Sequence, residues 1–296
     1  MSAHPKYGAL VAALLTALVS LGCEEAVNPV ALTEEAFSLY GFLDPTADRQ
    51  AVRVFSIDGV LENTRAEPMD AVFKTRNLVT GDEVVWRDSI ITYDNRTVGH
   101  VFVGDFQPGF DTPYELTVSS SDGRQTRVDI QTPADGEARV ANIASARSQV
   151  VVELEWTNVP RIIQTQSSYW VRVPFPDGTD TTTVRVDIRS GRVEENSDGS
   201  WRVTILPSAD IGVIFSALQL QPGRDPVFLD KIEVSAFVTS EDWVSPVGRF
   251  DPELLVQPGT FSNVEDGFGF VGGGYFDRFE FEVDDDVARN AGFSVE

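Results

Sequence analysis

The stretch Val184-Arg185-Val186-Asp187-Ile188 decides the fold class, because it alternates apolar and charged residues with a period of two. The stretch 169–173 continues the pattern, with a tyrosine and two valines alternating with a tryptophan and an arginine. Successive side chains of a β-strand point to opposite faces, so this alternation is typical of a strand with one buried face. The same period runs through residues 152–156 and 231–238. These stretches are therefore predicted to be half-buried strands.

Polar turns separate the predicted strands. Turn-forming residues occur at Gly81-Asp82, Asp122-Gly123, Pro176-Asp177-Gly178, Asp198-Gly199 and Pro222-Gly223. Short strands joined by polar turns, without alternating long helices, predict an all-β fold of antiparallel sandwiches. Two segments are candidates for helix. Residues 251–255 begin with an N-cap residue and a proline in the first turn, and residues 208–220 fit either a helix or a strand.

A domain boundary is predicted near residues 132–136, where proline and glycine follow a strand pattern. Before it, a Pro-Gly turn leads into a Tyr-x-Leu-x-Val strand within residues 108–130, which resembles the final hairpin of an immunoglobulin-like or fibronectin-type module. Such a sandwich has about 100 residues. We therefore expect an N-terminal immunoglobulin-like or fibronectin-like sandwich over residues 36–133, followed by a larger antiparallel β domain over residues 137–296.

Composition limits the function classes. The chain has 296 residues, of which 42% are hydrophobic, and its formal net charge is −23 at pH 7. This apolar content is enough for a large folded core and too high for a disordered chain. A surface of such negative charge repels phosphate backbones and anionic headgroups, so nucleic-acid binding is not expected.

The N-terminus has the order of an export signal. Lys6 precedes an apolar run over residues 8–21, and a small residue, Gly22, stands before Cys23. The run is shorter than the roughly 20 apolar residues that a transmembrane helix needs. Residues 1–22 are therefore predicted to be a signal peptide that is removed from the mature protein.

Cys23 is the only cysteine in the chain. Residues 19–23 resemble the lipobox of bacterial lipoproteins, in which a diacylglycerol is attached to the cysteine before cleavage, although Ser20 stands where that family usually has leucine. Ser20 and Gly22 also suit ordinary signal peptidase. A single thiol has no disulfide partner, however, which favours lipidation of Cys23 and anchoring to the membrane through it.

The residues after Cys23 predict a location. Glu24 and Glu25 resemble the acidic surface-export signal of Bacteroidota-type lipoproteins. Residues 23–35 lack a clear period and are predicted to be a lipid-anchored tether. We therefore expect an exported protein, anchored by lipid in the outer membrane and facing the cell exterior.

The glycine-rich phrase at residues 263–274 carries a family resemblance. It resembles the closing motif of a Bacteroidota-type outer-membrane lipoprotein family of unknown function, in which an Asn-Ile-x-x-Gly-x-Gly phrase precedes the last strand. Val271-Gly272 departs from that family, which more often has an aromatic residue and one glycine there. Members are often encoded beside TonB-dependent receptors. The resemblance thus implies an accessory role in nutrient capture, with such a receptor as partner.

The same phrase also fits a nucleotide-binding motif. Gly267, Gly269 and Gly272 satisfy G-x-G-x-x-G, which binds a pyrophosphate only between a strand and a helix of a βαβ unit. Residues 275–283 instead alternate as a strand. The glycines are therefore predicted to supply positive φ angles or close backbone packing, and no cofactor is expected.

Few residues suit catalysis or metal binding. His100 is the only histidine after the signal, and it is predicted to lie at a strand edge. Glycosidase chemistry needs only two carboxylates, but the pairs at 153 and 155 and at 280 and 282 fit a solvated strand face better. Residues 284–286 lack the spacing of a calcium loop and read as a solvated acidic tail. Neither catalytic nor metal-binding residues are predicted.

Tryptophans offer one further binding hypothesis. Trp170, Trp201 and Trp243 would stack on sugar rings if they were exposed, but core packing is the more common role of tryptophan in a sandwich. The sequence therefore predicts a non-catalytic cell-surface lipoprotein that assists TonB-dependent uptake. A carbohydrate-binding surface module is the alternative, and a glycoside hydrolase using paired carboxylates is a third. An exposed pair of tryptophans would favour the second, and a cleft with two facing carboxylates the third.

Overall fold

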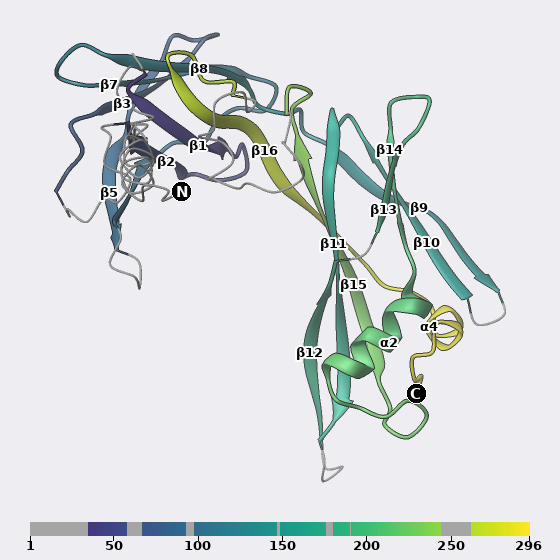
Figure 1. The fold of residues 1–296 in the computed structure, drawn as a ribbon. Helices are drawn as coiled ribbons and strands as arrows, with labels where there is room; N and C mark the ends of the chain where they lie inside the picture. The colour runs from purple at the N-terminus through teal and green to yellow at the C-terminus, as the bar shows by residue number, and fades with distance from the viewer. Residues whose placement is uncertain are drawn as a thin grey trace, which may run out of the picture.

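The computed structural model describes residues 35–57, 67–92, 98–146, 149–175, 180–189, 191–243 and 262–296. Over these residues the chain is all-β and arranged as two sandwiches, as predicted, and its strands pair in antiparallel except for one parallel pair, β1 with β16. Figure 1 shows the two sandwiches meeting at an angle, with strand β16 passing from one into the other. Among the described residues, no helix is long and apolar enough to cross a membrane.

The N-terminal sandwich is built from two sheets. The first sheet begins with the N-terminal half of β16. Next to it lie, in spatial order, β1 (Phe37–Leu43), β2 (Gln50–Ser56), β6 (Val98–Gly104) and β5 (Arg87–Thr92). The second contains, in spatial order, β4 (Glu83–Val85), β3 (Val72–Asn77), β7 (Pro113–Ser119) and β8 (Gln125–Gln131). The predicted hairpin is β7 and β8, which are paired from Pro113 opposite Gln131 to Ser119 opposite Gln125.

The C-terminal sandwich also has two sheets, with two helices beside it. The first sheet contains, in spatial order, β12 (Thr181–Ile188), β11 (Arg161–Pro174) and β15 (Phe228–Thr239), and the C-terminal half of β16 is its last strand. The second contains, in spatial order, β13 (Arg192–Glu195), β14 (Trp201–Ile205), β10 (Gln149–Thr157) and β9 (Glu137–Ala146). Helices α2 (Pro207–Ala217) and α4 (Asp285–Ala291) lie beside these strands in Figure 1.

The period-two alternation is confirmed by burial. In β10 the side chains of Val152, Leu154 and Trp156 are fully buried, while the intervening Glu153 and Glu155 face outward. The inward residues of β10, β11, β12, β14 and β15 form the C-terminal core. Burying one face of each strand in this way supplies the main stabilisation of a sandwich, roughly 25 cal/mol for each Å² of apolar surface removed from water.

Strand β16 (Gly267–Phe281) belongs to both sandwiches. Its first half pairs in parallel with β1, from Phe37 opposite Gly267 to Leu43 opposite Gly273. Its second half pairs in antiparallel with β15, from Thr239 opposite Gly274 to Ile232 opposite Phe281. The predicted second domain, residues 137–296, thus contains a segment that completes a sheet of the predicted first domain.

Residues just before β16 contact β8, which belongs to the second sheet of the N-terminal sandwich. The backbone of Glu265 exchanges two hydrogen bonds with Arg127 of β8, at 2.7 and 3.1 Å, and Thr126 donates to the carbonyl of Asp266. Val264 and Val271 lie in the N-terminal core. Segment 264–273 therefore contacts both sheets of a sandwich whose other strands come from residues 37–131.

The glycine phrase lies inside β16, so the prediction of close backbone packing is confirmed. At Gly269, where φ is +109°, a Cβ atom would lie 2.1 Å from the carbonyl oxygen of Leu39. At Gly273 it would lie 2.2 Å from the carbonyl oxygen of Gln131. G-x-G-x-x-G here lies inside one strand and does not lead directly into a helix, so it is not a dinucleotide-binding turn.

The helical segments differ in part from expectation. Helix α2 begins at Pro207 and covers most of residues 208–220, the segment that fits either a helix or a strand. The acidic residues 284–286 are exposed, as predicted, but they do not form an unstructured tail, because Asp284 is the N-cap of α4 and the next two residues form its first turn. Carboxylates at that position favour a helix because they face its positive end. The candidate helix at 251–255 and the predicted turn at 176–178 lie outside the described residues.

Candidate ligand-binding site

A hollow of about 180 Å³ opens on the face of β11, β12, β15 and β16 that points away from the C-terminal core. We call this surface the outer face. Six side chains that line the hollow are Gln164, Gln166, Arg185, Ser235, Phe276 and Arg278. They come from four strands of one sheet, so the strand pairing decides which of them are neighbours.

The hollow forms because a small residue lies between long ones. Gln166 on β11 is opposite Ser235 on β15, and Ser235 is opposite Arg278 on β16. Directly opposite side chains in antiparallel strands have Cβ atoms about 5 Å apart. The short serine therefore forms the floor, and the glutamine and arginine form two walls.

Phe276 forms an apolar wall of the hollow. Its side chain is 48% exposed, although its ring lies only 4.7 Å, centroid to centroid, from the ring of buried Phe237. Phe237, Trp243 and Phe270 form an aromatic cluster, with Phe42 packed against it, which we call the junction cluster. Because Phe237 is held in the junction cluster, it packs against Phe276, and about half of Phe276 stays exposed to solvent.

The two arginines of the hollow differ in their partners. Arg185 contacts Asp187 at 2.8 Å and Glu233 at 3.4 Å, and it donates to the Ser168 hydroxyl at 3.0 Å. The Ser168 hydroxyl and the Arg185 guanidinium lower the pKa of Asp187, which therefore stays ionised. The Arg185 charge is thus compensated within the site.

Arg278 has no ion pair or side-chain hydrogen bond with any residue in the described part of the chain. It is exposed, and its nearest cross-strand neighbour on β15 is the neutral Ser235. A guanidinium carries five N–H donors in a fixed plane, so here those donors face solvent and the hollow. The hollow consequently presents one guanidinium that forms no ion pair within the described residues, on a chain whose net charge is −23.

The tryptophans do not form an exposed pair. Trp243 is buried in the junction cluster, and Trp201 is opposite Trp156 in β14 and β10, packed against the C-terminal core. Trp170 alone of these three lies on the outer face, where Lys231 Nζ is 5.0 Å and Arg185 Cζ is 5.8 Å from its ring centroid. Core packing is confirmed for Trp201 and Trp243.

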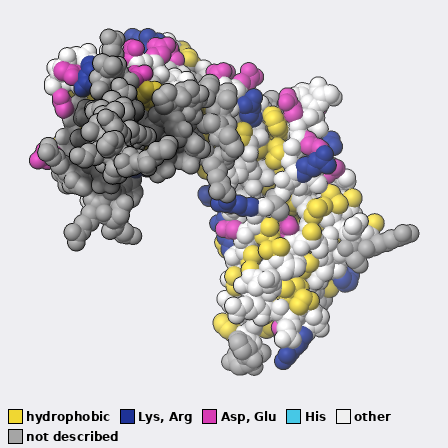
Figure 2. Space-filling view, viewed as in Figure 1, with side chains coloured by type: hydrophobic (Ala, Val, Ile, Leu, Met, Phe, Trp, Pro, Cys, Tyr) yellow, Lys and Arg dark blue, Asp and Glu magenta, His cyan; other side chains and the backbone are white. Residues whose placement is uncertain are grey.

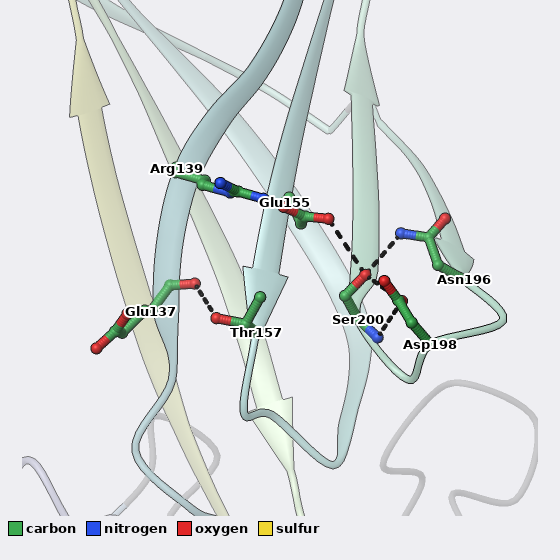
Figure 3. Close-up of polar contacts among 7 residues, drawn as sticks. All are labelled: Glu137, Arg139, Glu155, Thr157, Asn196, Asp198 and Ser200. Atoms are coloured by element: carbon green, nitrogen blue, oxygen red, sulfur yellow. Dashed lines mark hydrogen bonds and ion pairs between the residues drawn. The ribbon is translucent and has the colours of Figure 1, made fainter.

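The carboxylates of β10 are held by specific partners. Figure 3 shows Glu155 between Arg139, with which it forms an ion pair, and the hydroxyl of Ser200, 3.3 Å from Glu155 Oε1. Ser200 also donates to Asp198 from its backbone and its hydroxyl, at 3.0 and 2.7 Å, and the hydroxyl contact lowers the pKa of Asp198. A general acid of a glycosidase needs a raised pKa, so the lowered pKa of Asp198 does not suit that role. The hydrogen bonds of Ser200 instead connect the 196–200 turn to Glu155 of β10.

The other predicted carboxylates are also accounted for. Glu153 is 3.9 Å from Arg202 and accepts a hydrogen bond from Asn142. Glu280 forms an ion pair with Lys231, and Glu282 is exposed. The expectation of a solvated face holds for Glu280 and Glu282, which are exposed, whereas Glu153 and Glu155 are ion-paired and only partly exposed. No group of three or more potential metal ligands occurs in the described ranges.

His100 does not lie at a strand edge, so that prediction is wrong. It sits within β6, between β2 and β5, and its side chain is 4% exposed. Its Nδ1 lies 2.8 Å from Asp88 Oδ2, and Asp88 also accepts a hydrogen bond from the backbone of Met69. The pair stabilises the interior of the N-terminal sandwich, since a buried imidazole needs such a partner.

Sequence reasoning missed the residues that line the hollow. The alternation in residues 231–238 and 275–283 does place Ser235 and Arg278 outward, but it does not say which outward residues meet. The predicted lipid-attachment residue, Cys23, lies outside the described residues. Lipidation of Cys23 stays a prediction.

Around α2, the exposed hydrophobic side chains of the described residues do not form a second candidate site. On the face that Figure 2 shows, hydrophobic side chains where α2 lies are interspersed with backbone and other side chains. The largest exposed members near α2 are Leu206 and Val213, which are 45% and 50% exposed. Single exposed apolar residues of this kind are normal on a protein surface.

No protein-family model matches this chain, and none of the curated proteins matches it. Solved structures similar to it include a pullulanase from Anoxybacillus sp. LM18-11 complexed with maltotriose, at 9% identity and a TM-score of 0.23. That alignment covers 70% of this chain and 24% of the pullulanase, so the chain spans about a quarter of its length. Bovine butyrophilin is 9% identical over 68% of this chain and 91% of its own, at a TM-score of 0.20. Likeness at these scores carries no argument about function.

Proposed function

We propose that this chain is a non-catalytic lipoprotein of the cell surface that binds a small ligand on its outer face and assists nutrient uptake through a TonB-dependent receptor. The observation that carries the binding role is the hollow between Gln166, Ser235, Arg278 and Phe276. An apolar wall combined with a few converging polar groups is the usual composition of a ligand site. The single thiol at Cys23 supports the anchor, and the phrase at residues 263–274 supports the uptake role.

A carbohydrate-binding module is the alternative that one observation favours. Phe276 offers a half-exposed aromatic face beside two glutamine amides, and this combination suits a ring with an apolar face and hydroxyl groups. The hypothesis that the chain is a glycoside hydrolase has less support. The carboxylates of Glu153, Glu155 and Glu280 are each engaged by a basic side chain.

Replacement of the cysteine tests the anchor. We expect Cys23→Ala to release the full chain from the membrane fraction and to abolish its labelling by a fatty-acid analogue, because the thioether bond is no longer possible. Ser20→Leu is the matched control, since it restores the usual lipobox residue and should keep both anchoring and label. Membrane retention of the alanine variant, together with an unlabelled wild-type chain, would refute the anchor.

Isolation of the anchored chain tests the uptake role. After mild cross-linking of intact cells, we expect the wild-type chain to co-purify with a TonB-dependent receptor and the Cys23→Ala chain to lose it. Added protease should degrade the wild-type chain on intact cells if it faces the exterior. A protected chain that purifies without any receptor would contradict both parts of the proposal.

A further inference from the structure

We infer that the hollow on the outer face binds a carboxylate-bearing sugar, such as one uronate unit of an acidic polysaccharide. The inference rests on the proposed function and deepens it by assigning the charge class of the ligand. It depends on three features of the site: Arg278, which has no ion pair among the described residues, the exposed ring of Phe276, and the amide and hydroxyl groups between them.

The two arginines of the hollow indicate that the ligand is negatively charged. Arg185 is held by Asp187 and Glu233, so its guanidinium is already engaged by carboxylates of the protein. Arg278 has no such partner within the described ranges and lines the same hollow. A planar guanidinium binds a carboxylate through two parallel hydrogen bonds, and bonds between charged groups are the stronger kind. The site therefore favours an anion over a neutral ligand.

The other residues that line the hollow indicate that the ligand contains a ring with hydroxyl groups. Phe276, which is 48% exposed, presents an apolar surface that a bare inorganic anion cannot use. Gln164, Gln166 and Ser235 supply donors and acceptors together, and neighbouring hydroxyl groups of a sugar need both. A pyranose ring with a carboxylate combines an apolar face, hydroxyl groups and negative charge in one small molecule.

The size of the hollow limits the ligand to a single unit. Its volume of about 180 Å³ lies below the ~300–1,000 Å³ of sites for drug-sized molecules. The hollow is open to solvent on the outer face of a sheet, so the neighbouring units of a longer chain extend outside it. We therefore expect both a free uronic acid and an oligomer of it to bind, with one unit in contact with Arg278.

Titration calorimetry on the detergent-solubilised full chain tests the inference, with galacturonic acid, trigalacturonate and neutral galactotriose as probes. We expect both acidic probes to bind, galactotriose to bind at least tenfold more weakly, and affinity for the acidic probes to fall as salt is added. Arg278→Gln should weaken trigalacturonate binding about tenfold or more, because a hydrogen-bonded charge pair is lost, and should leave the affinity for galactotriose unchanged. Arg192→Gln is the matched control, since it removes the same charge from the exposed strand β13 and should change neither affinity.

Two further variants separate charge from shape. Phe276→Ala should weaken acidic and neutral probes alike, and Ser235→Leu should abolish binding of both by filling the floor. Equal wild-type affinity for the acidic and neutral trisaccharides, unchanged in Arg278→Gln, would overturn the anionic class while leaving a ligand-binding function intact. Absence of binding to all three probes would overturn the inference, and the Cys23→Ala experiment would still decide the anchor independently.

Discussion

At the scale of single residues, the glycines of β16 decide how closely the chain packs. Gly269 combines a φ of +109° with contact to the backbone of Leu39, and Gly273 contacts the backbone of Gln131 in the same way. Nearby, the Asn263 side chain accepts from the backbone N–H of Val271 at 3.1 Å and donates to its carbonyl at 2.6 Å. An asparagine amide imitates a strand partner in this way, because it offers one donor and one acceptor side by side.

Replacement of Gly269 tests this packing. We expect Gly269→Ala to lower the free energy of unfolding by about 3 kcal/mol, because the new methyl group adds steric overlap with Leu39 to the cost of the positive φ. Gly199→Ala is the matched control. Gly199 also has a positive φ, of +82°, but nothing lies within 4 Å of the added carbon, so we expect a loss of only about 1 kcal/mol. Urea denaturation measures both, and equal losses would show that close packing is not the cause.

At the scale of elements, helix α2 is attached to β11 by a buried hydrogen bond. The first turn of α2 has no side-chain cap, but its Asp210, which is 5% exposed, accepts a hydrogen bond of 2.6 Å from the Tyr169 hydroxyl. The ring of Phe293 stacks on Tyr169. Burial, with the adjacent carboxylate of Asp210, raises the pKa of Tyr169 well above its usual range.

This contact predicts a loss of stability in alkali. The folded pKa of Tyr169 is raised and its unfolded pKa is about 10, so its contribution is complete below pH ~10 and is lost as pH rises further. Tyr275, whose pKa burial raises to about 12, adds to the same trend. We expect Tyr169→Phe to cost about 1 to 3 kcal/mol at pH 7, because the buried hydrogen bond from Tyr169 to Asp210 is lost, and to make the fall above pH 10 shallower.

Urea denaturation at pH 7, 9, 10 and 11 measures this dependence. Phe293→Leu is the control, because it weakens the contact with Tyr169 without removing a titrating group, and its pH slope should equal that of the wild type. A Tyr169→Phe variant with an unchanged alkaline slope would show that Tyr169 does not remain neutral in the folded chain.

At the scale of the whole molecule, the two sandwiches are joined by a shared strand and by packed aromatic rings. Strand β16 pairs with β1 in one sandwich and with β15 in the other. In the junction cluster, Trp243 contacts Phe270 and Phe237, with centroids 5.0 and 5.3 Å apart. Because the outer face ends at this cluster, the junction also positions Phe276 for the proposed ligand.

Joined in this way, the sandwiches are expected to unfold together. We predict one calorimetric transition for the wild-type chain, and two separate transitions for Trp243→Ala, which removes a ring that is 2% exposed at a cost of about 3 to 5 kcal/mol. Val213→Ala, at an exposed position on α2, should keep a single transition. Two transitions in the wild type would mean that β16 does not couple the sandwiches.

The sequence by itself determined the all-β class, and it placed individual strands well. Alternation in stretches such as 152–156 and 184–188 is a local property, because each strand must bury one of its two faces whatever its neighbours are. The candidate lipid site at Cys23 is local in the same sense, since it was recognised from adjacent residues. These predictions needed no knowledge of which strands are paired.

Only the tertiary structure decided that β16 is shared between the sandwiches and that Gln166, Ser235 and Arg278 lie in one row. Strand β16 pairs with β1, which lies more than two hundred residues earlier in the chain. The period-two pattern of a strand does not indicate which strand it pairs with, because pairing depends on backbone hydrogen bonds that every residue except proline can make. His100 was misplaced for the same reason, since β2 and β5 flank β6 only in the folded sheet. The hollow exists because register placed a serine between two long side chains, and register is a property of the assembled sheet.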